Sequence, residues 1–154
     1  MMSKATKSSL VKMAAKGKWD EGIKSTHTIR HFDSFSMDEP TSLGGKDTGA
    51  TPLEYVAAAL NGCKAVMIPL IAKEQNFSFS NLSFETVGIL DARGIMGESG
   101  VRTYFQKVRF NLEIATEESD ESLLELKREV ERRCPVYNMF IDAGIQVEVD
   151  WKKI

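Results

Sequence analysis

Residues 51–75 read TPLEYVAAALNGCKAVMIPLIAKEQ, a long and mostly apolar stretch that is entered through Pro52. Proline suits the first turn of a helix, because its missing N–H would have no partner there. The apolar residues cover nearly every side of such a helix, so we expect it to be buried all round. Its length approaches that of a membrane span, but Asn61, Lys64 and Pro69 interrupt it, and Pro69 should kink it. The stretch therefore predicts the central core helix of a soluble protein.

The length and composition are those of a globular protein. The chain has 154 residues, of which 42% are hydrophobic and 27% charged, so it can bury a sizeable core. We expect a disordered tail over residues 1–7 and a single domain over residues 8–154. A net charge of −2 gives no electrostatic reason to expect nucleic acid or an anionic membrane surface as a partner. The first residues lack the apolar core and cleavage site of a secretion signal, so we expect a cytoplasmic protein.

Hydrophobic patterns predict the other elements. Strands are expected at residues 8–18, 23–32, 34–38, 77–90, 101–114 and 145–151, with a turn at 19–22. The early half of 101–114 mixes polar and apolar residues on each face, so it needs a bulge, a twist or a second apolar contact. Residues 116–133 predict an amphipathic helix, and Pro135 opens a short helix over 136–143 that ends at Gly144. The result is an α+β domain with an antiparallel sheet packed on the apolar helix.

One chain with only six or seven strands cannot easily cover a helix that is apolar on nearly every side. A homodimer that buries two such helices together is a natural solution, and we predict one.

Residues 41–50, TSLGGKDTGA, form a polar, glycine-rich stretch that leads into the helix. A nucleotide-binding loop is disfavoured, because the spacing does not match GxxxxGK[ST] and no strand runs directly into it. We expect instead a loop that passes close to another backbone and that could line the mouth of a site.

His27 and His31 lie four residues apart in HTIRHF, a spacing that suits a metal site on a helix. This segment reads as a strand, in which the two side chains would share a face but lie roughly 13 Å apart. We therefore expect surface or dimer-edge histidines here and no metal site.

The chain has two cysteines, Cys63 and Cys134, too few for a disulfide scaffold or for a zinc site made of cysteines alone. Two small, buried core residues are the ordinary interpretation of such a pair. Two features favour a reactive pair instead. Cys63 lies in the small and polar run NGCK inside the apolar helix. Cys134 directly precedes Pro135, so its sulfur can lie at a helix N-terminus, where the dipole favours a thiolate.

The segment GGKDTGATPLEYVAAALNGC, followed by ERRCPVYNMF, resembles the OsmC/Ohr family of thiol-dependent peroxidases over residues 8–154. It is most similar to the OsmC-like branch with the motif GG-x-D-x-G-x-TP-x-E. The resemblance implies an entwined homodimer with two active sites at the subunit interface, and we expect no metal or organic cofactor. It implies that Cys63 attacks a hydroperoxide and that Cys134 resolves the sulfenic acid by forming a disulfide. A dithiol such as dihydrolipoamide would then reduce that disulfide.

The entry to the helix departs from the pattern of the family's peroxidases. They have Pro-Glu there, and the glutamate holds an arginine that stabilises the reactive thiolate. Here Leu53 follows the proline, and the acid is one position later, at Glu54. Glu54 is nine residues from Cys63, about 180° around an ideal helix, so it points away from the sulfur.

The family's arginine is the second departure. The matching hairpin region holds Lys18 and Lys24, and Arg30 lies further along the second expected strand. Because Cys63 is mid-helix, away from a helix N-terminus, a nearby cation matters for its reactivity. Either lysine could supply that charge, but neither could supply the bidentate clamp of an arginine.

These residues predict a thiol-dependent hydroperoxide reductase. An apolar helix beside the thiol favours organic hydroperoxides over hydrogen peroxide, because an alkyl tail needs an apolar groove. The alternative is a non-catalytic or weakly catalytic dimer that binds a small apolar ligand at its interface, which the two departures favour. A third hypothesis is a redox-sensing dimer that signals by forming the Cys63–Cys134 disulfide. Catalytic turnover distinguishes the enzyme from the other two.

Overall fold

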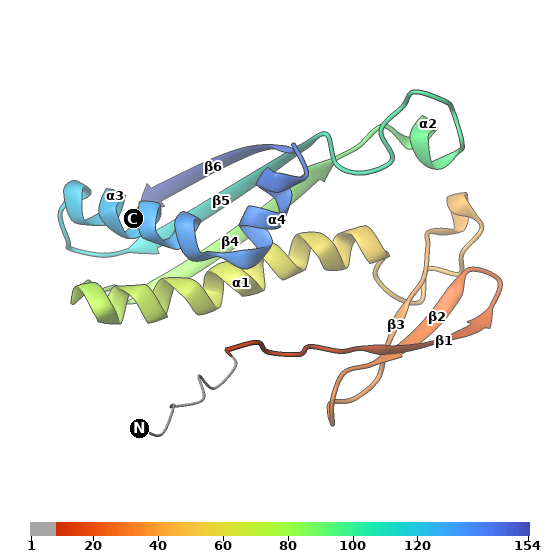
Figure 1. The fold of residues 1–154 in the computed structure, drawn as a ribbon, viewed down its shortest axis with the longest axis horizontal. Helices are drawn as coiled ribbons and strands as arrows, with labels where there is room; N and C mark the ends of the chain where they lie inside the picture. The colour runs from red at the N-terminus through yellow and green to blue at the C-terminus, as the bar shows by residue number, and fades with distance from the viewer. Residues whose placement is uncertain (1–8) are drawn as a thin grey trace, which may run out of the picture. The chain divides into compact units, whose positions relative to one another are not determined.

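The computed structural model describes residues 9–154, so the tail predicted at 1–7 lies outside the described residues. The chain divides into two compact units, an N-terminal unit up to Pro52 and a C-terminal unit over Leu53–Ile154. Each unit has its own three-stranded sheet (Figure 1). The single domain expected over 8–154 stays a prediction.

The N-terminal unit is an antiparallel meander of β1 (Lys16–Glu21), β2 (Lys24–Thr28) and β3 (Phe35–Met37). The first strand therefore begins at residue 16, later than the expected 8, and it continues through the turn expected at 19–22. Cross-strand bonding explains the extension, because Thr26 Oγ1 donates a hydrogen bond of 2.6 Å to Asp20. The turn follows instead at Gly22, whose φ of 54° glycine adopts without a steric cost.

The second strand is shorter than its pattern predicted. It ends at Thr28, and the chain then turns, with the amide of Phe32 donating to the carbonyl of Ile29. Arg30 takes a positive φ of 53° in this turn, and its guanidinium lies over the Phe32 ring at 4.6 Å. Arg30 therefore lies outside the strand, contrary to the expectation from the sequence.

A buried carboxylate, Asp38, organises the loop that precedes the long helix. Its oxygens accept hydrogen bonds from the backbone amides of Glu39, Lys46 and Thr48, at 2.9, 3.2 and 3.1 Å. The Thr48 hydroxyl donates a fourth bond at 2.8 Å. These bonds, that of the Thr48 hydroxyl first, lower the pKa of Asp38 to about 2 although burial opposes the shift. The loop is therefore wrapped around a permanent negative charge.

Two of the three glycines of this loop, Gly45 and Gly49, lie where the backbone approaches another segment, as the sequence predicted. A Cβ on Gly45 would lie 1.7 Å from the carbonyl oxygen of Glu39, and one on Gly49 would lie 2.5 Å from that of Ser36. Only glycine fits at such distances. The short 3₁₀ helix η1 (Thr41–Leu43) completes the loop.

The C-terminal unit has a mixed sheet with the order β4 (Asn81–Ile89), β5 (Lys107–Ala115) and β6 (Gln146–Lys153). β4 pairs with β5 antiparallel, whereas β6 runs parallel to β5. The central strand alternates as its pattern predicted: one face is exposed and the other is buried at Val108, Phe110, Leu112 and Ile114.

The connection between β4 and β5 differs from the expected strand over 101–114. The strand begins only at Lys107, and the preceding residues form a loop that follows a single helical turn, α2 (Ala92–Ile95). The mixed pattern therefore reflects a loop and not a bulge. Phe105 of this loop is buried against Gly88, where a Cβ would lie 2.3 Å from the ring.

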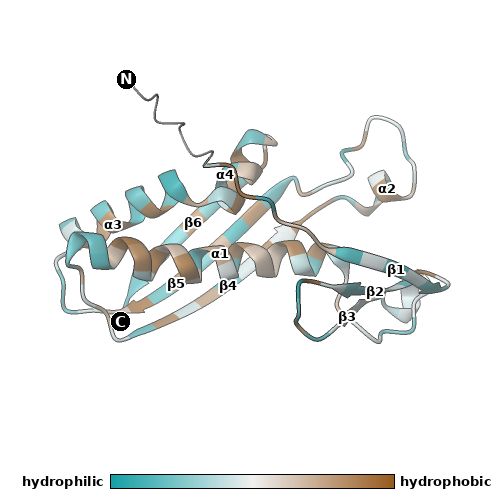
Figure 2. Cartoon of the chain, turned by 60° about the horizontal axis from the view of Figure 1, so that its bottom comes forward, coloured by the Kyte–Doolittle hydropathy of each residue, from teal (hydrophilic) through white to brown (hydrophobic). Residues whose placement is uncertain are grey.

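Three helices accompany this sheet: α1 (Pro52–Gln75), α3 (Asp120–Arg133) and α4 (Pro135–Asp142). In both Figure 1 and Figure 2, α1 and α3 run side by side along the sheet. Ser119 caps α3 by accepting a bond from the Ser122 amide. The buried residues of α1, α3 and α4 join the inner face of β5 in one hydrophobic core.

The helix α1 is not buried all round, contrary to the expectation from its composition. Only 28% of its most apolar 18-residue stretch is buried. The side chains of Val66 and Leu70 are 66% and 46% exposed. By length and composition alone α1 could cross a membrane. The core helices of soluble proteins have the same length and composition, so this property does not indicate a membrane protein. Leu60, Ile68 and Ile71 on one side of α1 belong to the core of the C-terminal unit, whose described residues leave Val66 and Leu70 exposed.

Candidate redox-active site

Two free thiols meet in the C-terminal unit. Cys63 lies half-buried in the middle of α1, and Cys134 lies fully buried at the junction of α3 and α4. Their sulfur atoms are 3.1 Å apart, with the Cys134 thiol donating to Cys63. Residues 71 positions apart in sequence thus place two sulfurs in direct contact.

The corner between α3 and α4 holds Cys134 in place. Pro135 occupies the first turn of α4, where the missing N–H needs no partner. The side-chain amide of Asn138 donates to the carbonyls of Glu131, Arg132 and Cys134 at 3.1, 3.2 and 2.9 Å. The bonds to Glu131 and Arg132 satisfy carbonyls that the end of α3 leaves unpaired, and the Cys134 carbonyl also accepts from the Asn138 backbone amide.

An ion pair joins the ends of α1 and α3. Arg133 reaches both carboxylate oxygens of Glu74, at 2.5 and 3.2 Å. This bidentate contact holds together the end of α1, which carries Cys63, and the end of α3, which directly precedes Cys134.

Burial raises the pKa of the Cys134 thiol to about 11, and the hydrogen bond to Cys63 acts in the same direction. The backbone amide of Tyr137, at the start of α4, and the charge of Lys64 lower it by less. The Tyr137 amide therefore acts as expected for a sulfur at a helix N-terminus, but desolvation of the enclosed sulfur outweighs this effect.

Lys64 follows Cys63 directly and is completely buried. Its ammonium lies 4.5 Å from the centre of the Tyr137 ring and 5.5 Å from that of Phe110. Within residues 9–154 it has no hydrogen-bond partner, and the same holds for the buried Oε1 of Glu131. Burial lowers the pKa of Lys64, while the charges of Cys134, Glu131 and Cys63 raise it by less.

The other residues expected at the site lie in the first turn of α1 and in the N-terminal unit. Glu54 lies exposed in the first turn of α1, about 13 Å along the helix from Cys63. Lys18, Lys24 and Arg30 belong to the N-terminal unit, in β1, in β2 and in the turn after β2. A role for these three cations beside the thiol stays a prediction.

The sequence alone did not single out Lys64, Tyr137 or Glu131. A lysine in an apolar helix, directly after the cysteine, was the one available signal, and it read as an interruption of the helix. Tyr137 and Glu131 each lie three residues from Cys134, the spacing of helical neighbours on one face, but only the fold turns them toward Lys64.

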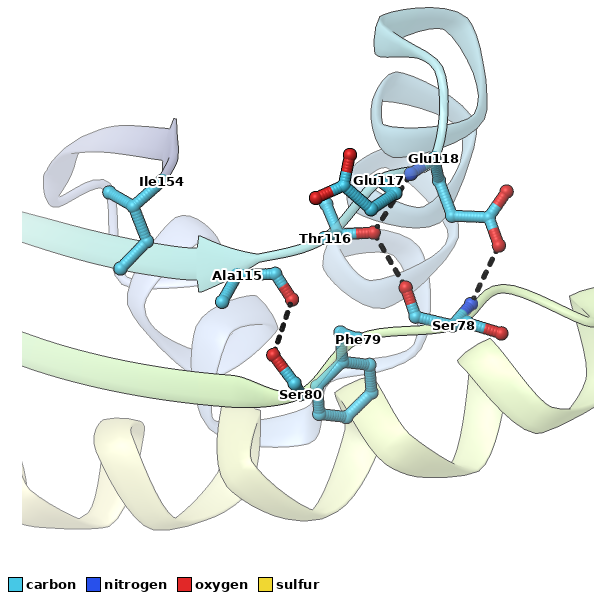
Figure 3. Close-up of a pocket in the computed structure, with 8 residues that line it drawn as sticks. All are labelled: Ser78, Phe79, Ser80, Ala115, Thr116, Glu117, Glu118 and Ile154. Atoms are coloured by element: carbon cyan, nitrogen blue, oxygen red, sulfur yellow. Dashed lines mark hydrogen bonds between the residues drawn. The ribbon is translucent and has the colours of Figure 1, made fainter.

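A surface cavity lies elsewhere in the C-terminal unit. About 480 Å³ in volume, it opens where β4 begins and β5 ends, between residues 78–80 and 115–118 (Figure 3). Its polar atoms bond to one another: Thr116 Oγ1 donates to the Ser78 carbonyl at 2.6 Å, and the Ser78 amide donates to Glu118 at 3.0 Å. These bonds close a turn, and no thiol lines the cavity. Among residues 9–154 no group of three histidine, cysteine or acidic side chains could hold a metal ion.

Known proteins share this fold and part of this sequence. A family model described as OsmC-like protein matches residues 45–150. No curated protein matches the sequence. The solved OsmC-like protein of Mycoplasma pneumoniae is 18% identical, with a TM-score of 0.79 over 94% of this chain and 98% of that one.

Two organic hydroperoxide resistance proteins have similar structures. That of Elizabethkingia anophelis is 18% identical, with a TM-score of 0.75 over 95% of this chain and 99% of that chain. That of Legionella pneumophila is also 18% identical, with a TM-score of 0.69 over 94% and 99%. At this identity the likeness is one of fold, whereas the family model covers more than half of the chain. The chain therefore belongs to the OsmC-like protein family.

Proposed function

We propose that this protein reduces organic hydroperoxides with two thiols, Cys63 as the peroxidatic and Cys134 as the resolving cysteine. The observation that supports this most is the 3.1 Å contact between the two sulfurs. The unequal burial of the pair supports the division of roles: the half-buried Cys63 can meet a substrate, and the enclosed Cys134 cannot.

The chemistry needs only these sulfurs, a peroxide and a dithiol. The Cys63 thiolate attacks one peroxide oxygen, the O–O bond breaks, and the alcohol leaves after taking up a proton. The resulting sulfenic acid then condenses with the Cys134 thiol, forming the disulfide and releasing water. A dithiol such as dihydrolipoamide reduces that disulfide and is itself oxidised to its cyclic disulfide.

The proposed substrate class follows from the surroundings of Cys63. The helix that carries it presents apolar side chains on its uncovered side, such as Val66 and Leu70. An alkyl or aryl peroxide can bury its tail against such a surface, whereas hydrogen peroxide has no tail to bury. The descriptions of two relatives as organic hydroperoxide resistance proteins support the same class.

The uncovered side of α1 also supports the homodimer. Apolar residues as exposed as Val66 are covered when two copies pack their long helices together. We expect light scattering to give the mass of two chains, and Val66→Glu to reduce that mass toward one chain. A concentration-independent monomer in the unsubstituted protein would contradict the dimer. For such a protein we also propose a cytoplasmic location, where dithiol reductants are maintained.

Intact mass spectrometry tests the two-thiol reaction. One equivalent of cumene hydroperoxide is added to the reduced protein, and we expect a rapid loss of two hydrogens. Cys134→Ser should instead gain one oxygen at Cys63, and Cys63→Ser should keep its mass. Turnover with dihydrolipoamide then distinguishes an enzyme from a sensor that is oxidised only once.

The second candidate is a dimer that binds a small apolar ligand at its interface. The departure at Leu53 and the exposed position of Glu54 favour it, because the peroxidase pattern places a glutamate directly after the proline. Thiols that stay reduced for minutes with cumene hydroperoxide would contradict the peroxidase and lead to a search for a co-purifying ligand.

A further inference from the structure

The two thiols are a pair of soft ligands at a defined separation. Cys63 and Cys134 are both free, and their sulfur atoms are 3.1 Å apart. One lies in α1 and the other at the corner before α4, so the fold and not a local motif sets this separation. Sulfur ligands select soft atoms. The pair therefore offers two bonds to any soft atom that can bridge them.

The separation of the sulfurs limits which atom can bridge them. An atom bonded to both at about 2.3 Å, the length of a zinc–thiolate bond, would hold them at an angle of about 85°. Tetrahedral zinc needs the sulfurs about 3.8 Å apart and two further ligands. In the part of the chain that the structure describes, no third histidine, cysteine or acidic side chain completes such a site. A linear ion such as copper(I) needs the two sulfurs on opposite sides of the metal.

Trivalent arsenic fits the geometry of this pair. It forms three bonds and keeps a lone pair, so the bonds make a pyramid with angles close to a right angle. Its bonds to sulfur are about as long as those of zinc. The two cysteines can therefore supply two of the three bonds. The third bond remains for a carbon substituent, so an arsenical that carries one organic group needs no further ligand from the protein.

The unequal burial of the pair leaves room for that organic group. Cys63 is half-buried and can meet the arsenical first, whereas Cys134 is fully buried behind it. Val66 and Leu70 follow Cys63 by three and seven residues, so they lie on the same side of α1, and both are exposed in the described chain. An organic group on arsenic can therefore lie against apolar side chains while the arsenic reaches Cys134.

We propose that Cys63 and Cys134 together form a binding site for trivalent organic arsenic compounds of the form R–As(OH)2. The Cys63 sulfur displaces one hydroxyl group from arsenic, and the Cys134 sulfur displaces the other. Each step forms an arsenic–sulfur bond, breaks an arsenic–oxygen bond and releases the thiol proton and the hydroxyl group as water. Arsenic stays trivalent, so no oxidant or reductant is consumed. Binding requires the contact of the two thiols and not the proposed peroxidase activity.

Phenylarsine oxide, whose hydrate has this form with a phenyl group, is the probe. One equivalent is added to the reduced protein. Native mass spectrometry should show one added phenylarsenic group and the loss of two hydrogens, and the number of titratable thiols should fall from two to none. In excess glutathione the group should be retained roughly a hundredfold longer than in Cys63→Ser or Cys134→Ser, because two attachments hold it. A small dithiol such as dimercaptopropanol should release it.

Two further comparisons need no substitution. Protein whose thiols have been joined by diamide as a disulfide should not bind phenylarsine oxide, because no free sulfur remains. An equimolar amount of zinc should leave both thiols of the reduced protein reactive toward a thiol reagent, since neither the angle nor the number of ligands suits zinc.

Three results would overturn the arsenic site: equal retention in Cys134→Ser, reaction of only one thiol in the unsubstituted protein, or protection of both thiols by zinc. These results are separate from the peroxidase. If cumene hydroperoxide leaves the thiols reduced while phenylarsine oxide engages both, the peroxidase fails and the arsenic site stands. If the hydroperoxide closes the disulfide while phenylarsine oxide takes one thiol only, the arsenic site fails and the peroxidase stands.

Discussion

The two units of the chain each enclose one charged side chain, and they treat it in opposite ways. In the N-terminal unit Asp38 is 1% exposed and accepts four hydrogen bonds. In the C-terminal unit Lys64 is fully buried and, within the described residues, has none. Burying a charge is costly unless it is paired and hydrogen-bonded. The comparison teaches that hydrogen bonds compensate for the burial of Asp38 and hold its loop together, whereas Lys64 is buried without that compensation.

Removal of the Asp38 charge should have the largest structural effect. In Asp38→Asn one acceptor oxygen becomes an amide donor, which opposes the donors of Lys46 and Thr48. Hydrogen exchange at these two amides should become roughly ten- to a hundredfold faster, as expected for the loss of bonds to a charged acceptor. Asp33→Asn, at an exposed position, is the matched control and should change neither amide.

Protonation of Asp38 at low pH should weaken the same hydrogen bonds of the loop without a substitution. Because the folded-state pKa of Asp38, about 2, is below its usual value, this carboxylate contributes stability above about pH 4 and loses it as the pH falls through about 2. An NMR titration of the Lys46 and Thr48 amides should therefore have its midpoint near pH 2. A midpoint close to 4 would show that the loop does not depend on the ionised carboxylate.

The sequence predicted much of the C-terminal unit because its elements follow simple periods. The alternation of β5 and the amphipathic pattern of α3 specify their buried faces locally, and the α+β class and the OsmC-like fold are confirmed. The parallel pairing of β6 with β5 was not predicted, because alternation within a strand does not state its direction beside a partner. The first two strands of the N-terminal unit were misplaced because few apolar residues mark their bounds, whereas β3 lies within its expected range of 34–38.

The site was predictable only in part. Both cysteines were selected, the pair by resemblance and each one by its local sequence, but the burial of Cys134 comes from packing and reverses the expected effect of the helix N-terminus. Lys64 was read as an interruption of an apolar helix, because no local pattern states whether a lysine faces solvent or a core. That Glu54 points away from Cys63 stays a prediction from helix geometry.

Lys64→Met tests the buried residue that lacks hydrogen bonds, and it should make the reduced protein more stable. The substitution removes a buried amine without a hydrogen-bond partner and gives up its contacts with the Tyr137 and Phe110 rings. We expect the free energy of unfolding to rise by about 1 kcal/mol, because the desolvation cost exceeds the ring contacts. Urea unfolding followed by Trp151 fluorescence measures it, and Lys73→Met, at an exposed position of the same helix, is the control.

The pH dependence of that difference has a definite sign. Since the folded-state pKa of Lys64 is lowered, the unfolded chain binds more protons, and stability rises with pH as the pH passes above that lowered value. Above about pH 9 the raised pKa of Cys134 opposes this rise, because the unfolded thiol then ionises first. Lys64→Met should lack the rise and keep the fall. A variant that is less stable than the unsubstituted protein would mean that Lys64 supports the fold.

The smallest energy is expected for the coupling between Thr86 and Asn61, which lies three residues before Lys64 on the same helix. Its Oδ1 accepts a hydrogen bond of 2.7 Å from the Thr86 hydroxyl, which ties α1 to β4. Asn61→Ala and Thr86→Val should each lower the free energy of unfolding by about 1 kcal/mol, and a double-mutant cycle should give a coupling of about 0.5–1 kcal/mol. A coupling near zero would mean that the bond contributes nothing to the fold. Stability changes of opposite sign for Asn61→Ala and Lys64→Met would show that, on one helix, the hydrogen-bonded polar group stabilises the fold and the one without a hydrogen bond does not.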